Sequence, residues 1–200
     1  MAMPWQPAGV AAVVGLAVVA STPGVGDDPG LRLRIVGIAM AAALAFVLDD
    51  RAAATLASSP VTLIERRALR LGLVLPLAAL WWIGIVGVVS ARRVAPLPST
   101  SLLALELAMY SALGFAGCVW SQRRSDDGSG GATGAATVAM LALAGVLPLP
   151  SWWPLAHSGS GGASLRLQLV LTFAIAALVL GSLDPSTGRA LRNRRQATGA

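Results

Sequence analysis

The side chains that could carry chemistry are few, and most of them stand singly. Glu106 is the one carboxylate clearly inside an apolar run, where an ionisable group is costly and usually faces a partner or a cavity. Helical spacing places Tyr110 and Cys118 on the same face as Glu106. Two roles follow for Glu106: lining a substrate path with Tyr110, or a structural role in which it reaches outward or pairs with Arg92 or Arg93. The structural role is favoured.

Other reactive groups do not form a catalytic constellation. His157 is the only histidine and lies near Ser160 in a Gly/Ser-rich stretch, which does not bring a nucleophile and a base together within a bundle. The acidic pairs Asp49-Asp50 and Asp126-Asp127 are isolated, no Gly-rich loop followed by Lys and Ser/Thr occurs, and Cys118 is the lone cysteine. We therefore predict a non-catalytic chain, with no catalytic, cofactor or metal site.

The composition indicates a membrane protein. Hydrophobic residues make up 56% of the 200 residues and charged residues 12%, whereas a soluble domain carries about 25% charged residues. All 15 basic side chains are arginines, and they flank apolar runs instead of forming a patch. This distribution is typical of membrane topology signals and argues against binding of nucleic acid.

Apolar runs predict an all-α bundle that forms a single transmembrane domain over residues 1–200. A membrane-spanning helix needs about 17–25 residues, and six candidates occur, at about 4–21, 31–48, 71–90, 102–120, 133–149 and 165–183. Pro76 in the third is tolerated in a membrane helix. The first is short and ends in a sequence that resembles a signal-peptidase site, but the absence of a preceding basic side chain favours an uncleaved span.

Small residues recur at four-residue spacing in two of these spans. Gly37, Ala41 and Ala45 form such a face in the second span, and Ala177 and Gly181 in the sixth. Small side chains let helix backbones approach closely. These faces predict close helix packing in a bundle or dimer.

The arginines also predict an orientation, because cytoplasmic loops are enriched in basic residues. With both termini inside, ten arginines are cytoplasmic and five are external. The cytoplasmic set is Arg51, Arg66, Arg67, Arg70, Arg123, Arg124, Arg189, Arg192, Arg194 and Arg195, and the external set is Arg32, Arg34, Arg92, Arg93 and Arg166.

The connection between the second and third spans, residues 49–70, predicts a helical elbow on the cytoplasmic side. Its first half is Ala-rich, and Ser59 and Pro60 suit the N-cap and first position of a second helix. That helix carries Glu65 and runs straight into the third span. Pattern alone leaves two readings open: a surface that docks a partner, or an interfacial helix that anchors the loop to lipid headgroups.

The connection between the fifth and sixth spans is rich in proline and tryptophan. Trp152 and Trp153 are bracketed by prolines, and such residues suit the membrane–water interface. A short re-entrant or interfacial element and an ordinary aromatic-belt loop both fit this pattern.

Together, the six spans, the elbow and the Pro/Trp segment resemble the membrane subunits of type 2 ATP-binding-cassette (ABC) exporters. The stretch LDDRAAATLASSPVTLIERRALRL is also similar to the cytoplasmic loop of small actinobacterial permeases of this kind. The resemblance implies a coupling helix that docks on a separate ATPase, and a gate near Trp152 and Trp153. The implied ATPase-coupling residues are Asp50, Arg51, Thr55, Ser58, Ser59 and Glu65.

The resemblance further implies partners and a location. We expect two copies of a P-loop ATPase subunit and a second permease subunit, identical or different, in a bacterial cytoplasmic membrane. Two other classes stay open: a membrane scaffold that anchors partners through Arg66, Arg67 and the basic tail, and a secondary transporter that uses Glu106.

Overall fold

The computed structural model describes residues 6–21, 29–49, 63–92, 99–124, 130–146 and 162–183. Within these residues the chain is all-helical. The elements are α1 (Gln6–Ala20), α2 (Pro29–Ala45), the short 3-10 helix η1 (Phe46–Leu48), α3 (Leu63–Ala91), α4 (Thr100–Gln122), α5 (Gly131–Val146) and α6 (Gly162–Ser182).

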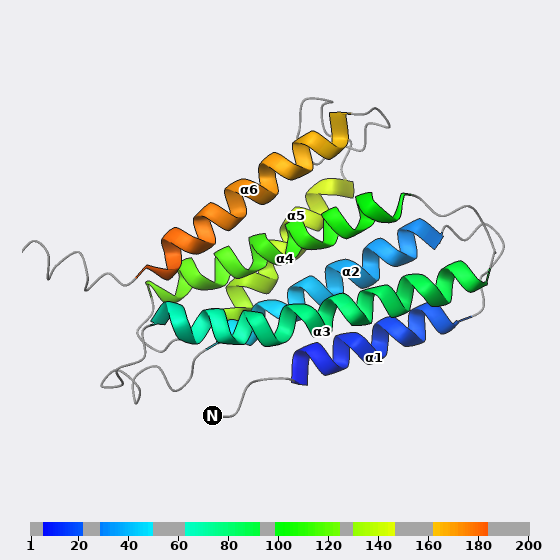
Figure 1. Cartoon of the computed structure of the whole chain (residues 1–200), viewed down its shortest axis with the longest axis horizontal. Coiled ribbons are helices and arrows are strands. Elements are labelled where there is room, and N and C mark those ends of the chain that lie inside the picture. The colour runs from blue at the N-terminus through cyan, green and yellow to red at the C-terminus, as the bar shows by residue number, and fades with distance from the viewer. Residues whose placement is uncertain are drawn as a thin grey trace, which may run out of the picture.

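Successive helices run in alternating directions along one long axis (Figure 1). Among the described helices, four segments are long and apolar enough to cross a membrane: Gly30–Leu48, Ile64–Ala91, Thr100–Gln122 and Leu165–Ser182. They match the second, third, fourth and sixth predicted spans. The helices at the first and fifth predicted spans have 15 and 16 residues, or about 22–24 Å, which is shorter than a hydrocarbon core of about 30 Å.

The core lies where α2, α3 and α4 meet. One buried cluster joins Leu44 and Val47 to Val74 of α3 and Phe115 of α4. A second cluster, around Leu33 and other side chains, brings in α1 as well. Helix α4 also packs against α5 and α6, so it is the central element of the bundle.

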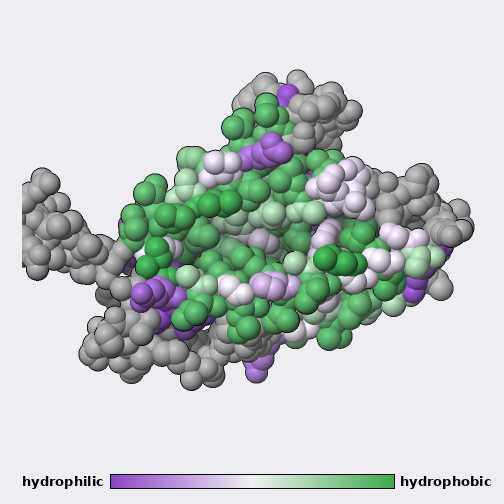
Figure 2. All heavy atoms as spheres, viewed as in Figure 1, coloured by the Kyte–Doolittle hydropathy of each residue, from purple (hydrophilic) through white to green (hydrophobic). Residues whose placement is uncertain are grey.

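The outer surface of the bundle is apolar. Figure 2 shows hydrophobic residues over most of the visible described face, with a hydrophilic group at the left end. Leu73, Leu80 and Ile83 of α3 are more than half exposed, as are Leu169 and Phe173 of α6. Exposed apolar surface of this extent suits contact with lipid rather than water. The architecture is therefore that expected of a multi-pass membrane protein.

Helix α3 begins eight residues before the predicted third span and continues through it without a break. Glu65 therefore lies in the same continuous helix as the third predicted span. Its 29 residues extend about 43 Å, longer than the hydrocarbon core. Pro76 lies inside this continuous helix.

The predicted small-residue faces lie at close helix contacts. Ala41 and Ala45 are fully buried, and a Cβ added at Gly114 would lie 3.6 Å from both the Ala41 carbonyl oxygen and the Ala45 Cβ. In α6, a Cβ at Gly181 would come within 2.7 Å of Val119. Small residues therefore set how closely α2 and α6 approach α4.

Candidate functional site

Polar side chains gather at one end of the bundle, where α2 ends and α3 begins. We call this the elbow end, because residues 50–62 join the two helices there. Its central residue is Asp49, the C-cap of η1. Asp49 Oδ1 accepts hydrogen bonds from the backbone N–H groups of Gly130 and Gly131, at 2.7 and 2.6 Å. The carboxylate thus caps the N-terminus of α5, where negative charge is favoured.

The backbone of the same segment is held by two other helices. Arg70 of α3 donates to the Asp49 carbonyl oxygen at 2.9 Å, and Gln122 of α4 donates to the Leu48 carbonyl oxygen at 2.8 Å. Gln122 Oε1 in turn accepts from Arg67 at 2.7 Å. Leu48 and Asp49 therefore connect the end of η1 to α3, α4 and α5 at once.

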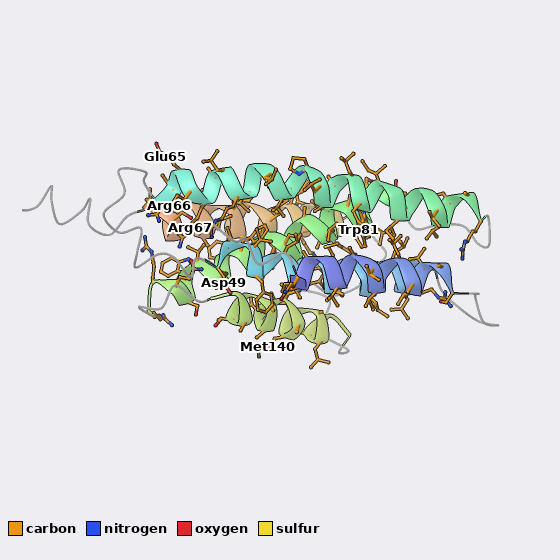
Figure 3. The ribbon with its side chains drawn as sticks, turned by 90° about the horizontal axis from the view of Figure 1, so that it is seen from below. Asp49, Glu65, Arg66, Arg67, Trp81 and Met140 are labelled. Atoms are coloured by element: carbon orange, nitrogen blue, oxygen red, sulfur yellow. The ribbon has the colours of Figure 1, made fainter. Side chains whose placement is uncertain are left out.

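The thiol of Cys118 lies inside this arrangement. Its Sγ is 3.9 Å from Asp49 Oδ1 and 3.5 Å from Gln122 Nε2, and its side chain is fully buried. We call the set Asp49, Arg67, Arg70, Cys118, Gln122, Gly130 and Gly131 the Asp49 junction. Figure 3 shows Asp49 between the end of α2 and α5, with Arg67 directed into the bundle and Glu65 away from it.

Helix α6 is tied to the same end through its last carbonyl groups. Arg123 donates to the carbonyl oxygens of Leu180, Gly181 and Leu183, and Arg67 also reaches that of Gly181, at 3.3 Å. The last carbonyls of a helix lack intrahelical partners and carry partial negative charge. An arginine side chain supplies both hydrogen-bond donors and a positive charge, so these arginines hold the helices together.

The alternative role of Arg67 as an anchor for a partner protein does not fit this geometry. Its side chain is only 7% exposed, and two of its nitrogens donate to groups on α4 and α6. A buried arginine with internal acceptors offers little to an external surface. Arg67 is a structural residue of the Asp49 junction.

A second polar centre lies between α2 and α4 near the opposite end. Arg34 donates to Glu106 through two nitrogens, with Nε–Oε2 at 3.0 Å and Nη2–Oε1 at 3.2 Å. The side chains are 28% and 16% exposed. This two-bond geometry is the strong form of an arginine–carboxylate pair, and it joins two helices that are long and apolar enough to span a membrane.

Glu106 is thus paired with Arg34 and not with Arg92. Arg92 instead donates to the carbonyl oxygens of Val19 and Ala20 at the end of α1, and Arg93 lies outside the described residues. The sequence did contain a signal for Arg34. It lies within the first two turns of α2, and Glu106 lies within the first two turns of α4, so both charges fall at similar depth on the same side.

The face of α4 that carries Glu106 and Tyr110 packs inward. Tyr110 is half-buried, and further along the helix Gly114 and Cys118 are buried. A Cβ at Gly114 would meet Val138 of α5 at 2.9 Å. The part of this face nearer the C-terminus of α4 thus serves helix packing, whereas Glu106, nearer the N-terminus, is hydrogen-bonded to Arg34.

Most of the predicted coupling and gate residues lie outside the described residues. These are Asp50, Arg51, Thr55, Ser58, Ser59, Trp152 and Trp153. The exception is Glu65, which is exposed in the first turn of α3. Among the residues that the structure describes, no three His, Cys, Asp or Glu side chains come together in a way that could hold a metal ion.

Comparison with known proteins adds no family to this description. No protein-family model matches the chain, and no curated protein and no solved structure matches it significantly.

Proposed function

We propose that this chain is the transmembrane permease subunit of an ATP-driven exporter of the ABC type. It would form the translocation path with a second permease subunit and take its mechanical input from two copies of a separate P-loop ATPase. The proposed architecture has six spans, a coupling-helix elbow over residues 49–70, and a re-entrant or interfacial segment between α5 and α6. ATP hydrolysis belongs to the partner.

The observation that carries the proposal is how the elbow end is built. Asp49 and Leu63 flank the connection 50–62 in the sequence, and hydrogen bonds hold the helix ends on both sides of it. Asp49 bonds to α3 and α5, and Arg67 bonds to α4 and α6. A force applied to this connection would therefore reach five helical elements directly. Such anchoring suits a coupling element better than a loop that only rests on lipid headgroups.

The length of α3 supports the same assignment. Helix α3 is about 13 Å longer than the hydrocarbon core, and its first two turns carry Glu65, Arg66, Arg67 and Arg70. A continuous helix moves as a unit, so a displacement at the start of α3 would be transmitted across the membrane.

The proposed orientation places the elbow end in the cytoplasm, with both termini inside. Among the described residues the arginines are nearly balanced, five at the elbow end and four at the opposite end, so they give little bias. The five are Arg66, Arg67, Arg70, Arg123 and Arg124, and the four are Arg32, Arg34, Arg92 and Arg166. Arg51 and the four tail arginines, Arg189, Arg192, Arg194 and Arg195, therefore supply the bias toward N-in, C-in.

A secondary transporter that uses Glu106 is less well supported. A coupling carboxylate must bind and release a cation or proton during transport. Glu106 is engaged by Arg34 through two hydrogen bonds, so the charge of Arg34 already serves as its counter-ion. The geometry favours a structural role for the pair.

The test is reciprocal co-purification from the native host in gentle detergent, with mass spectrometry of what is recovered. We expect the tagged chain to recover a P-loop ATPase, and the tagged ATPase to recover this chain. Arg51→Glu and Glu65→Arg should each lower recovery at least several-fold, because they reverse charges on the proposed docking element.

Arg124→Glu is the matched control for this experiment. Arg124 is an exposed arginine that follows α4, outside the elbow, so its reversal should leave ATPase recovery unchanged. Failure to recover any P-loop ATPase, with the chain monodisperse, would overturn the exporter assignment. An equal loss for all three variants would show non-specific electrostatic association.

A further inference from the structure

Helix α5 contacts the bundle through a face made mostly of small residues. Among residues 131–144, the buried positions are Gly131, Gly134 and Val138. A Cβ at Gly134 would lie 2.4 Å from the Gly114 carbonyl oxygen, so the contact is close but contains few side-chain atoms. Met140 and Leu143 are exposed, and Figure 3 shows Met140 pointing away from the bundle.

Within a membrane these small buried residues give α5 no large hydrophobic anchor. Lipid tails are as apolar as the neighbouring helices, so close packing and hydrogen bonds must fix its position. At its N-terminus those bonds are the pair from Gly130 and Gly131 to Asp49, and one between the hydroxyls of Ser121 and Thr133 at 3.0 Å. The only charged acceptor among these groups is Asp49, and charge-assisted bonds are the strongest of their kind.

The same residue has a second attachment through its backbone. The Asp49 carbonyl oxygen accepts from Arg70 of α3, while its carboxylate accepts from the start of α5. A shift of α3 relative to α2 that changes the Asp49 backbone would also move the carboxylate away from α5. Asp49 therefore links the start of α5 to α3 through a single residue.

We propose that Asp49 is a conformational latch: its carboxylate holds the N-terminus of α5 against α2 and α4, and its release lets α5 separate from the bundle at this end. The latch deepens the proposed function and rests on it only for the source of the movement. Whether the latch exists can be tested on the isolated chain, without an ATPase.

Cys118 provides a native probe for this opening. It is the only cysteine of the chain, is fully buried, and lies behind the Asp49 carboxylate. In the closed junction both a small and a bulky maleimide should react slowly with it. Separation of α5 should admit the bulky reagent, so the ratio of the bulky to the small rate constant measures opening.

The rate ratio also removes a chemical complication. Loss of the Asp49 charge alters the reactivity of the neighbouring thiol, but the same thiolate attacks both reagents. With the chain in lipid nanodiscs, Asp49→Ala should raise the ratio by about tenfold or more, because two bonds to a charged acceptor are lost. Asp49→Asn keeps an acceptor oxygen without the charge and should give a smaller increase, of about threefold.

Gly131→Ala tests the latch without removing the carboxylate. The added Cβ would lie 2.6 Å from Phe46 and 2.8 Å from Asp49 Oδ2, so the start of α5 must move outward and the rate ratio should rise. Gly72→Ala is the matched control, since a Cβ added at Gly72 of α3 has nothing within 4 Å, and it should leave the ratio at the wild-type value.

The outcomes separate the latch from its alternatives. An unchanged ratio in Asp49→Asn and Gly131→Ala, in monodisperse protein, would overturn the proposal, even if Asp49→Ala failed to accumulate. Equal acceleration of both reagents in the Asp49 variants would also overturn it, because that result reports thiol chemistry and not opening. A raised ratio in a chain that recovers no ATPase would support the latch while contradicting the exporter assignment.

Discussion

At the scale of single residues, the Arg34–Glu106 pair joins two spans inside the apolar region. Each side chain satisfies the other through two hydrogen bonds, and removal of one partner leaves an uncompensated charge in a largely buried position. We therefore expect a clear loss of stability when either residue is neutralised alone. Once one residue has been neutralised, neutralising the other should have little further effect.

A double-mutant cycle tests this coupling. We expect Glu106→Gln and Arg34→Gln each to destabilise the chain, and the double variant to lose less than the sum, with a coupling energy of about 1 kcal/mol or more. Melting temperatures in detergent provide the measurement, at about 2–4 °C per kcal/mol for a chain of this size.

The exchanged pair Arg34→Glu with Glu106→Arg gives a second check. It should recover part of the lost stability, because the opposite charges still meet between α2 and α4. Strict additivity of the single variants would show that the pair makes no net contribution.

At the scale of helices, glycines decide which contacts tolerate side chains. Gly134 of α5 has no room for a Cβ, which would lie 2.4 Å from the Gly114 carbonyl oxygen and 2.8 Å from the Ala45 Cβ. Gly72 of α3 has nothing within 4 Å of the same position. The two glycines therefore form a matched comparison of crowded and open helix surfaces.

We expect Gly134→Ala to destabilise the chain by about 1–3 kcal/mol, because α5 must move away from both α2 and α4. Gly72→Ala should be neutral or stabilising by up to about 1 kcal/mol, since alanine favours the helix and meets nothing. Thermal unfolding in one detergent compares the two, and equal effects would argue against the close α4–α5 contact.

The sequence predicted these helices better than their contacts. Apolar runs and their lengths indicate where a membrane helix can form, because in lipid the backbone N–H and C=O groups must be hydrogen-bonded within the helix. The helix ends lie within a few residues of the predicted span ends, except that α3 starts before the third predicted span, in the stretch where the sequence predicted a helix carrying Glu65. Helix α3 begins earlier because Glu65 to Arg70 have high helix propensity and nothing in this stretch stops a helix.

The interhelical partners could not be read from the sequence in the same way. Asp49 caps an N-terminus 81 residues away, and no local pattern marks a bond over that distance. The arginines could be counted but not assigned to partners, because an arginine gives the same topological signal whether it faces solvent or caps a neighbouring helix. Only Arg34 and Glu106, at matching depth, offered a pairing signal.

At the scale of the whole molecule, orientation should depend on the tail. Arg189, Arg192, Arg194 and Arg195 account for four of the ten arginines assigned to the cytoplasmic side. Their removal leaves six against five, a difference too small to set topology firmly. Mixed insertion is the expected consequence.

Reporter fusions at the C-terminus measure this directly. With all four tail arginines changed to Gln, an alkaline phosphatase fusion should gain activity and a fluorescent protein fusion should lose signal. The pair Arg93→Gln and Arg166→Gln removes charge from the opposite side and should leave the C-terminus inside. Unchanged reporters in the tail variant would show that the remaining arginines suffice to orient the chain.

The Arg34–Glu106 pair also has a consequence for how the chain is made. Its members are 72 residues apart, so a ribosome working at about 5–20 residues per second needs about 4–14 s between them. During that interval α2 enters the bilayer with an unmatched cation, and the Asp49 carboxylate likewise precedes α5. We therefore expect the insertion machinery to retain nascent α2 during this interval. Release into lipid before α4 and α5 arrive would leave Arg34 and Asp49 without their partners.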